Sequence, residues 1–208
     1  MLVLVLVLVR MLVLVLVRVL VRMLVRMLVQ VQLRCSPQVL ARYILDHPSS
    51  VSGRRVLDLG SGGGAATLAA VRSGAAAVTA NDIDPACRLA LAMNAELSGT
   101  SLEAVAVEEA DLLDPAAFPG ELLASTDVIL VGDMLYDEEI GDRVFALCQA
   151  FKGLRAGNEV YLGDPGRWVL AARPAAAGRL ACLARAELGE AARKENSGLT
   201  TAAVWRML

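Results

Sequence analysis

An apolar strand that runs directly into a glycine-rich turn is the feature that most constrains the fold of this chain. Residues 56–64 read VLDLGSGGG, and an Ala-rich helical stretch follows from Ala65. Glycines at Gly60, Gly62 and Gly64 let the backbone turn sharply and approach a ligand that any Cβ would obstruct. The N-terminus of the helix behind them offers free N–H groups. The pattern predicts a strand–helix unit with a ligand site, and its alternative interpretation is an ordinary tight turn.

The body of the chain, from Ser36 onward, alternates short apolar runs with Ala-rich helical stretches, as α/β proteins with a parallel sheet do. The predicted strands lie near residues 54–59, 76–81, 103–107, 127–132, 158–163 and 200–206. The predicted helices cover residues 37–46, 65–73, 85–97, 138–152 and 170–187. A hydrophobic fraction of 56% supplies a sizeable core. We therefore expect one α/β domain over residues 36–208, a mostly parallel, twisted, Rossmann-like sheet with helices on both faces.

Residues 1–34 form a low-complexity extension of Leu, Val, Met and Arg. Every Arg in it has an even number, while odd positions are almost all Val or Met, so the pattern is that of a two-faced, aggregation-prone β ribbon. Three interpretations compete: an artefact or neutral extension, a degenerate targeting segment, and a membrane anchor. A membrane span needs about 20 apolar residues, and no uncharged run here exceeds the nine of residues 1–9. We expect no stable membrane span.

The charge of the chain is unevenly spread. Residues 1–34 contain five Arg and no acid, which leaves 15 Lys and Arg against 22 Asp and Glu in the remainder, a net charge of −7. Proteins that bind nucleic acid normally carry a basic patch. The balance argues against a nucleic-acid partner and favours a basic protein partner.

Cysteine and histidine are too sparse for a zinc site of the usual spacing. The four cysteines are far apart, with no Cys-x-x-Cys pair, and the single histidine, His47, lies at an expected helix end. We expect no metal, and we interpret His47 as a polar helix terminus. Dispersed cysteines indicate a reducing compartment.

Acidic residues follow the next two predicted strands at positions that suit a nucleotide. The second strand leads into Asp82, which lies 22 residues after Gly60. An acid at that distance binds the ribose hydroxyls in nucleotide-binding sheets. Asp111 follows the third strand, so three successive strand ends carry a glycine turn or a carboxylate. The arrangement predicts a cleft at the carboxyl edge of the sheet.

Asp58 distinguishes between the possible cofactors. A dinucleotide site needs Gly-x-Gly-x-x-Gly with room for phosphates, whereas here a carboxylate lies two residues before Gly60. Asp-x-Gly-x-Gly-x-Gly over residues 58–64 resembles motif I of class I methyltransferases that bind S-adenosylmethionine. The resemblance implies that Asp58 lies near the methionine part of that cofactor, that Asp82 binds the ribose hydroxyls and that Asp111 faces the adenine amine.

The resemblance assigns the remaining cofactor contacts to the glycine turn and to the residue after Asp82. These contacts are Gly60, Gly62, Gly64 and Ile83. The alternative interpretation of each single aspartate is a turn or cap residue.

A carboxylate and a phenol leave the fourth predicted strand three residues apart. Residues 132–139 read GDMLYDEE, so Asp133 and Tyr136 lie at the open end of the sheet and can converge on one nucleophile. Asp-x-x-Tyr resembles the signature of seven-strand protein lysine methyltransferases, in place of the Asn-Pro-Pro-Tyr of amide and adenine methyltransferases. In the alternative interpretation, Asp133 caps the helix over 137–152 and Tyr136 is a packing residue.

That resemblance implies an enzyme with modest catalytic demands. The sulfonium of the cofactor already activates its methyl group, so the site need only align a neutral lysine amine. A lysine ammonium has a pKa of about 10.4, and it must lose a proton before it attacks. Asp133 would accept a hydrogen bond from the nitrogen, and Tyr136 would orient it from the other side. Neither a covalent nucleophile nor a metal is required.

Three segments narrow the resemblance to one branch of that family. Residues 132–138, 163–167 and 195–201 read GDMLYDE, GDPGR and ENSGLTT. They are similar to the lysine methyltransferases of the electron transfer flavoprotein β subunit, and the likeness covers about residues 38–206. It implies that β subunit as the protein substrate and the mitochondrial matrix as the location, with the cytoplasm as the alternative. We expect a monomer.

The chain departs from that branch just before its first predicted helix. The branch carries an aromatic segment similar to Trp-Pro-Gly-Gly, which is implied to wall the cofactor pocket, whereas here Cys35, Ser36 and Pro37 stand in its place. Two alternatives therefore accompany the main prediction. One is a methyltransferase that acts on another protein lysine, and the other is an inactive relic without the front wall of its pocket.

Overall fold

The computed structural model describes residues 35–114, 116, 119–172, 177–190, 193 and 198–208. The expectations for residues 1–34 lie outside this part of the chain, as do residues 195–197 of the segment 195–201. None of the helices among the described residues is long and apolar enough to cross a membrane.

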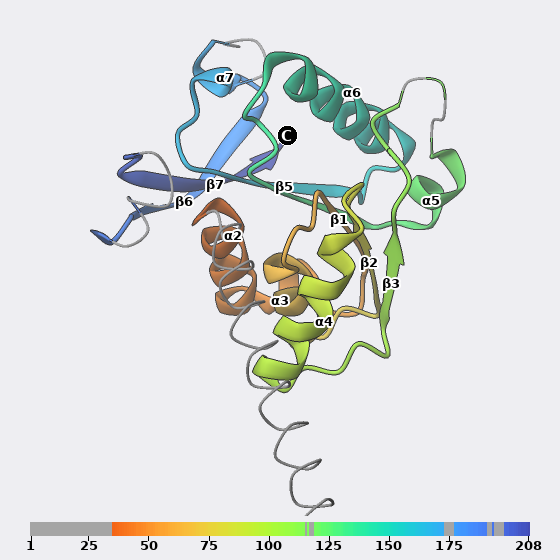
Figure 1. The fold of residues 1–208 in the computed structure, drawn as a ribbon. Coiled ribbons are helices and arrows are strands. Elements are labelled where there is room, and N and C mark those ends of the chain that lie inside the picture. Colours follow the sequence, from red (N-terminus) through yellow and green to blue (C-terminus); the bar gives the residue numbers. More distant parts are fainter. Residues whose placement is uncertain (1–34, 115, 117–118, 173–176, 191–192, 194–197) are drawn as a thin grey trace, which may run out of the picture. The chain divides into compact units, whose positions relative to one another are not determined.

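The described residues form a seven-stranded sheet flanked by helices (Figure 1). The strands are β1 Arg55–Leu59, β2 Ala77–Asn81, β3 Val105–Glu108, β4 Val128–Gly132, β5 Glu159–Asp164, β6 Leu180–Glu187 and β7 Thr201–Met207. The helices are α2 Cys35–Asp46, the short 3₁₀ helix η1 Pro48–Ser50, α3 Ala65–Arg72, α4 Ala86–Ser98, α5 Gly120–Ser125, α6 Glu138–Leu154 and α7 Trp168–Ala171.

The sheet has the strand order β3-β2-β1-β4-β5-β7-β6. The first five strands are parallel, and β7 lies antiparallel between β5 and β6. The prediction of a mostly parallel, doubly wound α/β sheet is confirmed.

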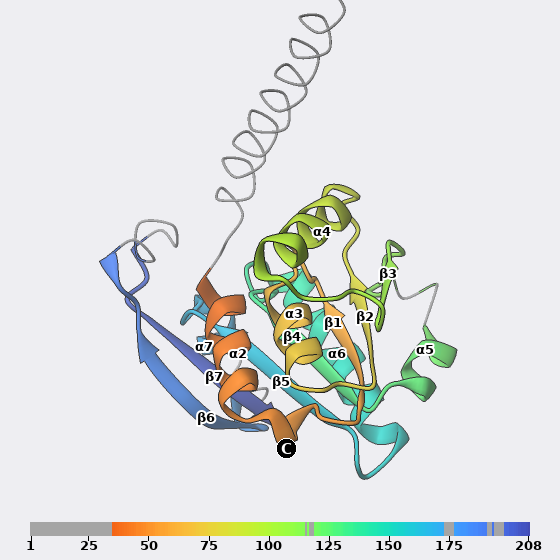
Figure 2. The ribbon, with the colours of Figure 1, turned by 90° about the horizontal axis from the view of Figure 1, so that it is seen from below.

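Side chains along the central strands alternate between two buried layers. In β1, Val56 belongs to a buried cluster with Leu40 of α2, while the next residue, Leu57, belongs to a second cluster with Phe151 of α6. Figures 1 and 2 show α2, α3 and α4 on one face of the sheet and α5, α6 and α7 on the other. Because both faces are covered, the strands are continuous apolar runs, as buried parallel strands require.

The prediction of a helix over residues 170–187 is wrong. Helix α7 ends at Ala171, and residues 180–187 form strand β6, which pairs antiparallel with β7. This stretch is rich in Ala, Leu and Arg, which favour a helix locally. Pairing with β7 overrides that preference, because tertiary contacts outweigh the small propensity differences between residues.

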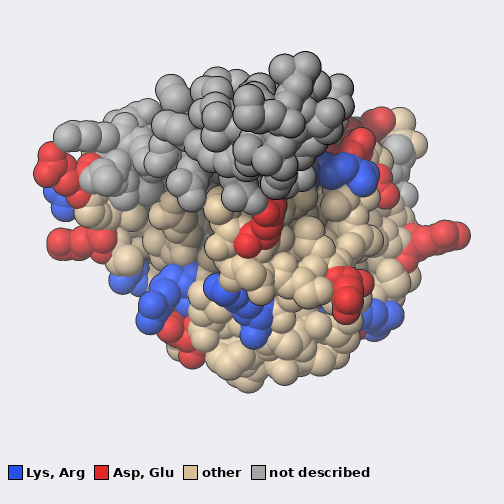
Figure 3. Space-filling model, turned by 60° about the horizontal axis from the view of Figure 1, so that its bottom comes forward, with Lys and Arg blue, Asp and Glu red and all other residues tan. Residues whose placement is uncertain are grey.

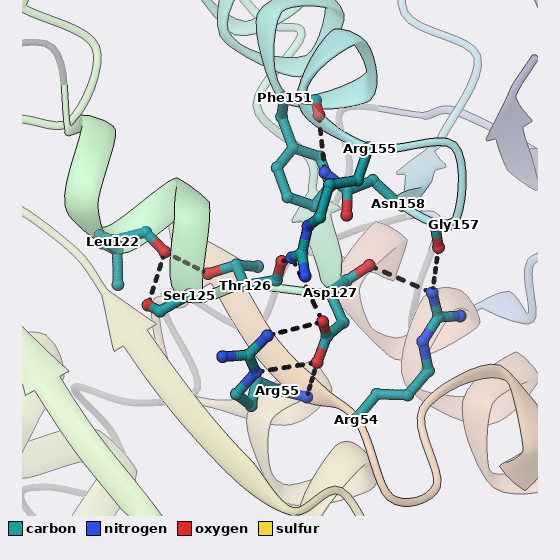
Figure 4. Close-up of polar contacts among 10 residues, drawn as sticks. All are labelled: Arg54, Arg55, Leu122, Ser125, Thr126, Asp127, Phe151, Arg155, Gly157 and Asn158. Atoms are coloured by element: carbon teal, nitrogen blue, oxygen red, sulfur yellow. Dashed lines mark hydrogen bonds and ion pairs between the residues drawn. The ribbon is translucent and has the colours of Figure 1, made fainter.

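A cluster of arginines around Asp127 holds together the ends of the sheet opposite the carboxyl edge (Figure 4). Arg55 donates to both carboxylate oxygens of Asp127, at 3.0 and 2.9 Å, and Arg155 approaches the same carboxylate at 3.3 Å. Arg54 donates to the Gly157 carbonyl at 2.6 Å. The hydrogen bonds from Arg55 hold the pKa of Asp127 well below its usual range. This network fixes the start of β1 against β4 and β5.

On the face drawn in Figure 3, basic side chains lie in small groups separated by acidic and uncharged residues. The visible part of this face shows no continuous basic stripe.

Candidate active site

Five strand ends bring four of the predicted site residues, together with one residue that was not predicted, Asp164, to one edge of the sheet. Strands β3, β2, β1, β4 and β5 are parallel, so the residues that follow them lie along the same edge. These residues are Asp111, Asp82, Gly60, Asp133 and, at the end of β5, Asp164. The chain reverses its direction of winding between β1 and β4, and ligands of doubly wound sheets bind at such a switch point.

The glycine turn after β1 depends on two glycines for close packing. Gly60 has φ +68°, and a Cβ there would lie 2.2 Å from Met134 Sδ. Gly64 has φ +79°, and a Cβ there would lie 2.3 Å from Leu91 Cδ1. A Cβ at Gly62, where φ is +51°, would meet nothing within 4 Å. The turn is therefore packed at both ends and open at its centre.

The carboxylate of Asp82 shapes this turn from the neighbouring strand. Its Oδ2 accepts a hydrogen bond from the Gly62 backbone N–H at 2.9 Å, and its Oδ1 accepts one from the Asp84 N–H at 3.0 Å. Ile83, between the two aspartates, is 67% exposed. The structure thus places two predicted cofactor residues, Asp82 and Gly62, in direct contact.

Asp58 lies beneath the turn and is buried. Its Oδ2 accepts a hydrogen bond from Thr67 Oγ1 at 2.6 Å, which ties β1 to the first turns of α3. Burial raises the pKa of the Asp58 carboxyl to about 6, against the opposing effect of the Thr67 hydrogen bond, and the charge of Asp82 raises it further. Asp58 lies within strand β1, so it is not a turn residue, but the backbone N–H of Thr67 in the first turn of α3 also hydrogen-bonds to it, as in the alternative of a cap residue.

Asp111 is exposed beyond the end of β3. Its Oδ1 accepts a hydrogen bond from the Leu113 N–H at 2.9 Å, as a turn residue does. Asn81 fixes the approach to it, because its side-chain amide donates to the carbonyls of Glu108 and Ala110 at 3.0 and 2.9 Å. The role of Asp111 toward the adenine amine stays a prediction.

Asp133 is buried and held by an arginine. Its backbone has φ +58°, and its side chain is 2% exposed. Arg167 Nε lies 2.5 Å from Asp133 Oδ1, and the second terminal nitrogen of Arg167 lies 2.9 Å from Oδ2. These hydrogen bonds raise the pKa of the Arg167 guanidinium above its ordinary value.

The helix after Asp133 is capped by a different aspartate. Asp137 is the N-cap of α6, where its side chain accepts from the N–H groups of Glu139 and Ile140. The alternative that Asp133 caps this helix is therefore wrong. Tyr136 is 42% exposed, and it lies near enough to Arg167 for the two groups to interact electrostatically.

Sequence reasoning assigned no role to Arg167 or Asp164, although both belong to the segment GDPGR that it singled out. Asp164 is buried, and its carboxylate accepts from the N–H groups of Gly166 at 2.8 Å and Arg167 at 3.2 Å. Burial raises the pKa of the Asp164 carboxyl to about 6. Thr67 was missed as well, and its place one helical turn after the glycines is the signal that points to it.

Across the residues that the structure describes, no group of three or more His, Cys, Asp or Glu side chains could hold a metal ion. His47, directly after α2, stacks on Tyr43 with ring centroids 4.2 Å apart and bonds the Tyr43 carbonyl through Nδ1, which confirms it as a polar helix terminus. The described residues of the site thus offer a glycine turn, carboxylates, the phenol of Tyr136 and the guanidinium of Arg167. Such groups can bind a nucleoside and orient an amine.

Comparison with known proteins agrees with this geometry. A family model described as lysine methyltransferase matches residues 20–162. The chain is similar to the electron transfer flavoprotein beta subunit lysine methyltransferase of Mus musculus, with 39% identity over 173 residues, and to that of Danio rerio, with 40% identity over 169 residues. Each match covers 81% of this chain and 62% of the relative. The chain thus spans less than two thirds of the length of these relatives.

Solved structures show the same fold. The crystal structure of ribosomal protein L11 methylase from Lactobacillus delbrueckii subsp. bulgaricus superposes with a TM-score of 0.53 at 19% identity, covering 81% of this chain and 76% of that one. This likeness confirms the predicted class I methyltransferase fold.

Proposed function

We propose, because the chain belongs to the lysine methyltransferase family, that it transfers methyl groups from S-adenosylmethionine to lysines of a protein substrate. The observation that carries the proposal is the placement of two sets of residues at one edge of the sheet. The glycine turn and Asp82 form the first set, and Asp133 and Tyr136 form the second. A cofactor and an amine held by these sets would lie next to each other.

The residues of the first set fit a nucleoside with an amino-acid tail. Gly62 leaves the centre of the turn free of any side chain, so a ligand can approach the backbone there. Each oxygen of Asp82 accepts one N–H, and a carboxylate has lone pairs for about four hydrogen bonds. The thiol of Cys87 also hydrogen-bonds to this carboxylate, so Asp82 keeps capacity for one further donor, such as a ribose hydroxyl. When bound, S-adenosylmethionine supplies a methyl group activated by a sulfonium.

The residues of the second set fit an amine that must be aligned. Asp133 comes from the end of β4, next to Gly60 at the end of β1, and Met134 packs directly on Gly60. Asp133 would accept a hydrogen bond from the substrate nitrogen, and the half-exposed Tyr136 would limit its approach from the solvent side. Holding the nucleophile in line accounts for a large part of the rate of such reactions.

The proposed protein substrate is the β subunit of electron transfer flavoprotein. Support comes from the two relatives that are 39–40% identical to the chain, which are lysine methyltransferases of this subunit. The net charge of −7 outside residues 1–34 also suits a lysine-bearing surface through complementary fields. We also propose the mitochondrial matrix as its location, which rests only on the resemblance to that branch, with the cytoplasm as the alternative.

A methyl-incorporation assay tests this function. The purified full chain is incubated with S-adenosylmethionine and the recombinant β subunit, and mass spectrometry locates any added methyl groups. Asp133→Ala should lower turnover by about a hundredfold, as misalignment of a reacting group does, while cofactor affinity measured by calorimetry changes little.

The outcomes separate the alternatives. Methylation of another protein in place of the β subunit would support a lysine methyltransferase with a different substrate. Cofactor binding without methylation of any protein would support an inactive relic. An unaltered rate in Asp133→Ala would show that the assigned role of Asp133 is wrong.

A further inference from the structure

One arginine meets both oxygens of the carboxylate that is expected to receive the substrate amine. The distances of 2.5 and 2.9 Å from Arg167 to Asp133 describe a two-point contact, and the Arg167 side chain is only 23% exposed. Such a contact fixes the plane of the carboxylate, which the single ammonium of a lysine could not do.

The loop that carries Arg167 is itself held in place. The Asp164 carboxylate accepts from the Gly166 and Arg167 backbone N–H groups, and Gly166 has φ +83°, a conformation that favours glycine. Register also matters, because Gly132 pairs with Gly163, so the residues after β4 and β5 come side by side. The position of Arg167 is therefore built by the backbone and does not depend on its side-chain contact alone.

The charge of Arg167 has a chemical consequence for a lysine at this site. Only the neutral amine has the lone pair that attacks. An uncompensated carboxylate beside a lysine favours its charged form. In the transfer, the ammonium first loses a proton to solvent, the nitrogen lone pair then forms the new N–C bond, and the electron pair of the S–C bond stays on sulfur.

We propose that Arg167 is a positioning residue of the methyl-transfer site, which orients the Asp133 carboxylate and compensates its charge so that the target lysine is held as a neutral amine. The inference rests on the proposed function. Arg167 donates one hydrogen bond to each oxygen of the carboxylate. In the proposed site, the substrate amine hydrogen-bonds to the same carboxylate, whose plane these two bonds fix.

Among the residues that the structure describes, charged and titratable groups approach Asp133 from the following places. Arg167 lies on the loop after β5, Asp164 ends β5, and Tyr136 precedes α6. The pKa of the Asp164 carboxyl is about 6, so its titration falls below pH 7. Repeating the measurements in a Tyr136→Phe background removes the phenol as a source of any change above pH 7.

Two substitutions separate charge from orientation. Arg167→Gln keeps a hydrogen-bond donor but removes the charge. Arg167→Lys keeps the charge but loses the planar guanidinium that contacts both carboxylate oxygens. The matched control is Arg143→Gln, which removes an arginine from the exposed ion pair with Glu139 on α6. Initial rates with the full chain, saturating S-adenosylmethionine and the β subunit are measured from pH 7 to 10, with cofactor affinity measured by calorimetry.

In the pH–rate profile of Arg167→Gln, we expect the rising limb to shift to higher pH by about one pH unit. The rate at pH 7.5 should therefore fall about tenfold. In Arg167→Lys the limb should stay in place while kcat falls at every pH. Cofactor affinity should stay within about twofold of the wild type in both, and Arg143→Gln should match the wild type.

If the rising limb of the pH–rate profile stays at the same pH in Arg167→Gln, the inference is wrong. A faster rate of Arg167→Gln at neutral pH would also overturn it, because it would mean that Arg167 hinders binding of the lysine. If Arg167→Gln fails to fold, a wild-type kcat in Arg167→Lys overturns it. If the wild type is active and both Arg167 variants have the same rates as the wild type, the inference is contradicted but the proposed function is not. A wild type that methylates no protein at any pH contradicts the proposed function and the inference with it.

Discussion

The carboxylate of Asp82 accepts a hydrogen bond from the backbone N–H of Gly62 at 2.9 Å. The residue that is expected to bind the ribose therefore also shapes the turn that is expected to pass beneath the methionine part of the cofactor. One side chain links the two halves of the proposed cofactor site, at the ends of neighbouring strands.

Substitution of Asp82 should weaken cofactor binding through both contacts. We expect Asp82→Ala to reduce affinity for S-adenosylmethionine and for its demethylated product by about 10- to 100-fold, since hydrogen bonds to charged groups contribute about 1.5–3 kcal/mol. Asp82→Asn keeps one acceptor oxygen, so its affinity should lie between those of the wild type and of Asp82→Ala. Calorimetry measures all three proteins. Equal affinity of the wild type for a nicotinamide dinucleotide would refute the cofactor assignment.

Gly64→Ala should destabilise the protein more than Gly53→Ala. Both glycines have positive φ, at +79° and +70°, so both substitutions incur the left-handed penalty of about 1–2 kcal/mol. A Cβ at Gly64 also meets Leu91, which is 1% exposed, whereas a Cβ at Gly53 meets nothing within 4 Å. Overpacking should add about 1–3 kcal/mol at Gly64. Urea unfolding checks this, and equal losses would contradict it.

Asp58→Asn should stabilise the protein increasingly as pH rises from about 4 to 7. The pKa of Asp58 is about 6 in the folded state against about 3.9 in the unfolded chain, so the folded state binds more protons in between. The stability contributed by this group is present below about pH 4 and lost as pH rises through about 6. The asparagine variant lacks this loss.

The measurement for Asp58 is the difference in free energy of unfolding between variant and wild type, from urea titrations at pH 4.5, 5.5 and 7. We expect it to grow to at most about 3 kcal/mol, the equivalent of two pKa units. Asp164 has a pKa raised to the same range, but it is present in both proteins and cancels in the difference. A difference in free energy of unfolding that is constant with pH would show that burial does not raise the pKa of Asp58.

Removal of residues 1–34 should leave the melting temperature within a few degrees. Their alternating pattern has no matching partner strand in the sequence, and five of them are charged. Thermal unfolding of the shortened and full chains checks this. A loss equivalent to several kcal/mol, well above the usual surface effect, would mean that the segment packs on the domain.

Much of the fold was predictable because parallel strands buried on both faces leave long apolar runs in the sequence. The same topology explains why Asp82, Asp111 and Asp133 could be assigned to one edge, since Asp82 and Asp133 directly follow such runs and Asp111 lies three residues after β3. Strand β6 could not be predicted in this way. Its residues are mostly half-buried or exposed, so neither a buried run nor a clear alternation marks them.

The contact between Asp133 and Arg167 could not be read from local patterns, because 34 residues separate them. It depends on the pairing of β4 with β5, which is a property of the whole sheet. A weak signal does exist, because a Gly-Asp pair marks the end of both strands: Asp133 directly follows β4, and Asp164 is the last residue of β5. Two equivalent strand ends at neighbouring positions bring their following loops together.

The insertion of β7 between β5 and β6 has a consequence for biosynthesis. A nascent chain on the ribosome can assemble β1 to β5, but the edge of β5 stays unpaired until residues 201–207 have emerged. An unpaired apolar edge is a template for pairing with another chain. The sheet formed by β1 to β5 is therefore open to aggregation and to chaperone capture until β7 has emerged and paired with β5.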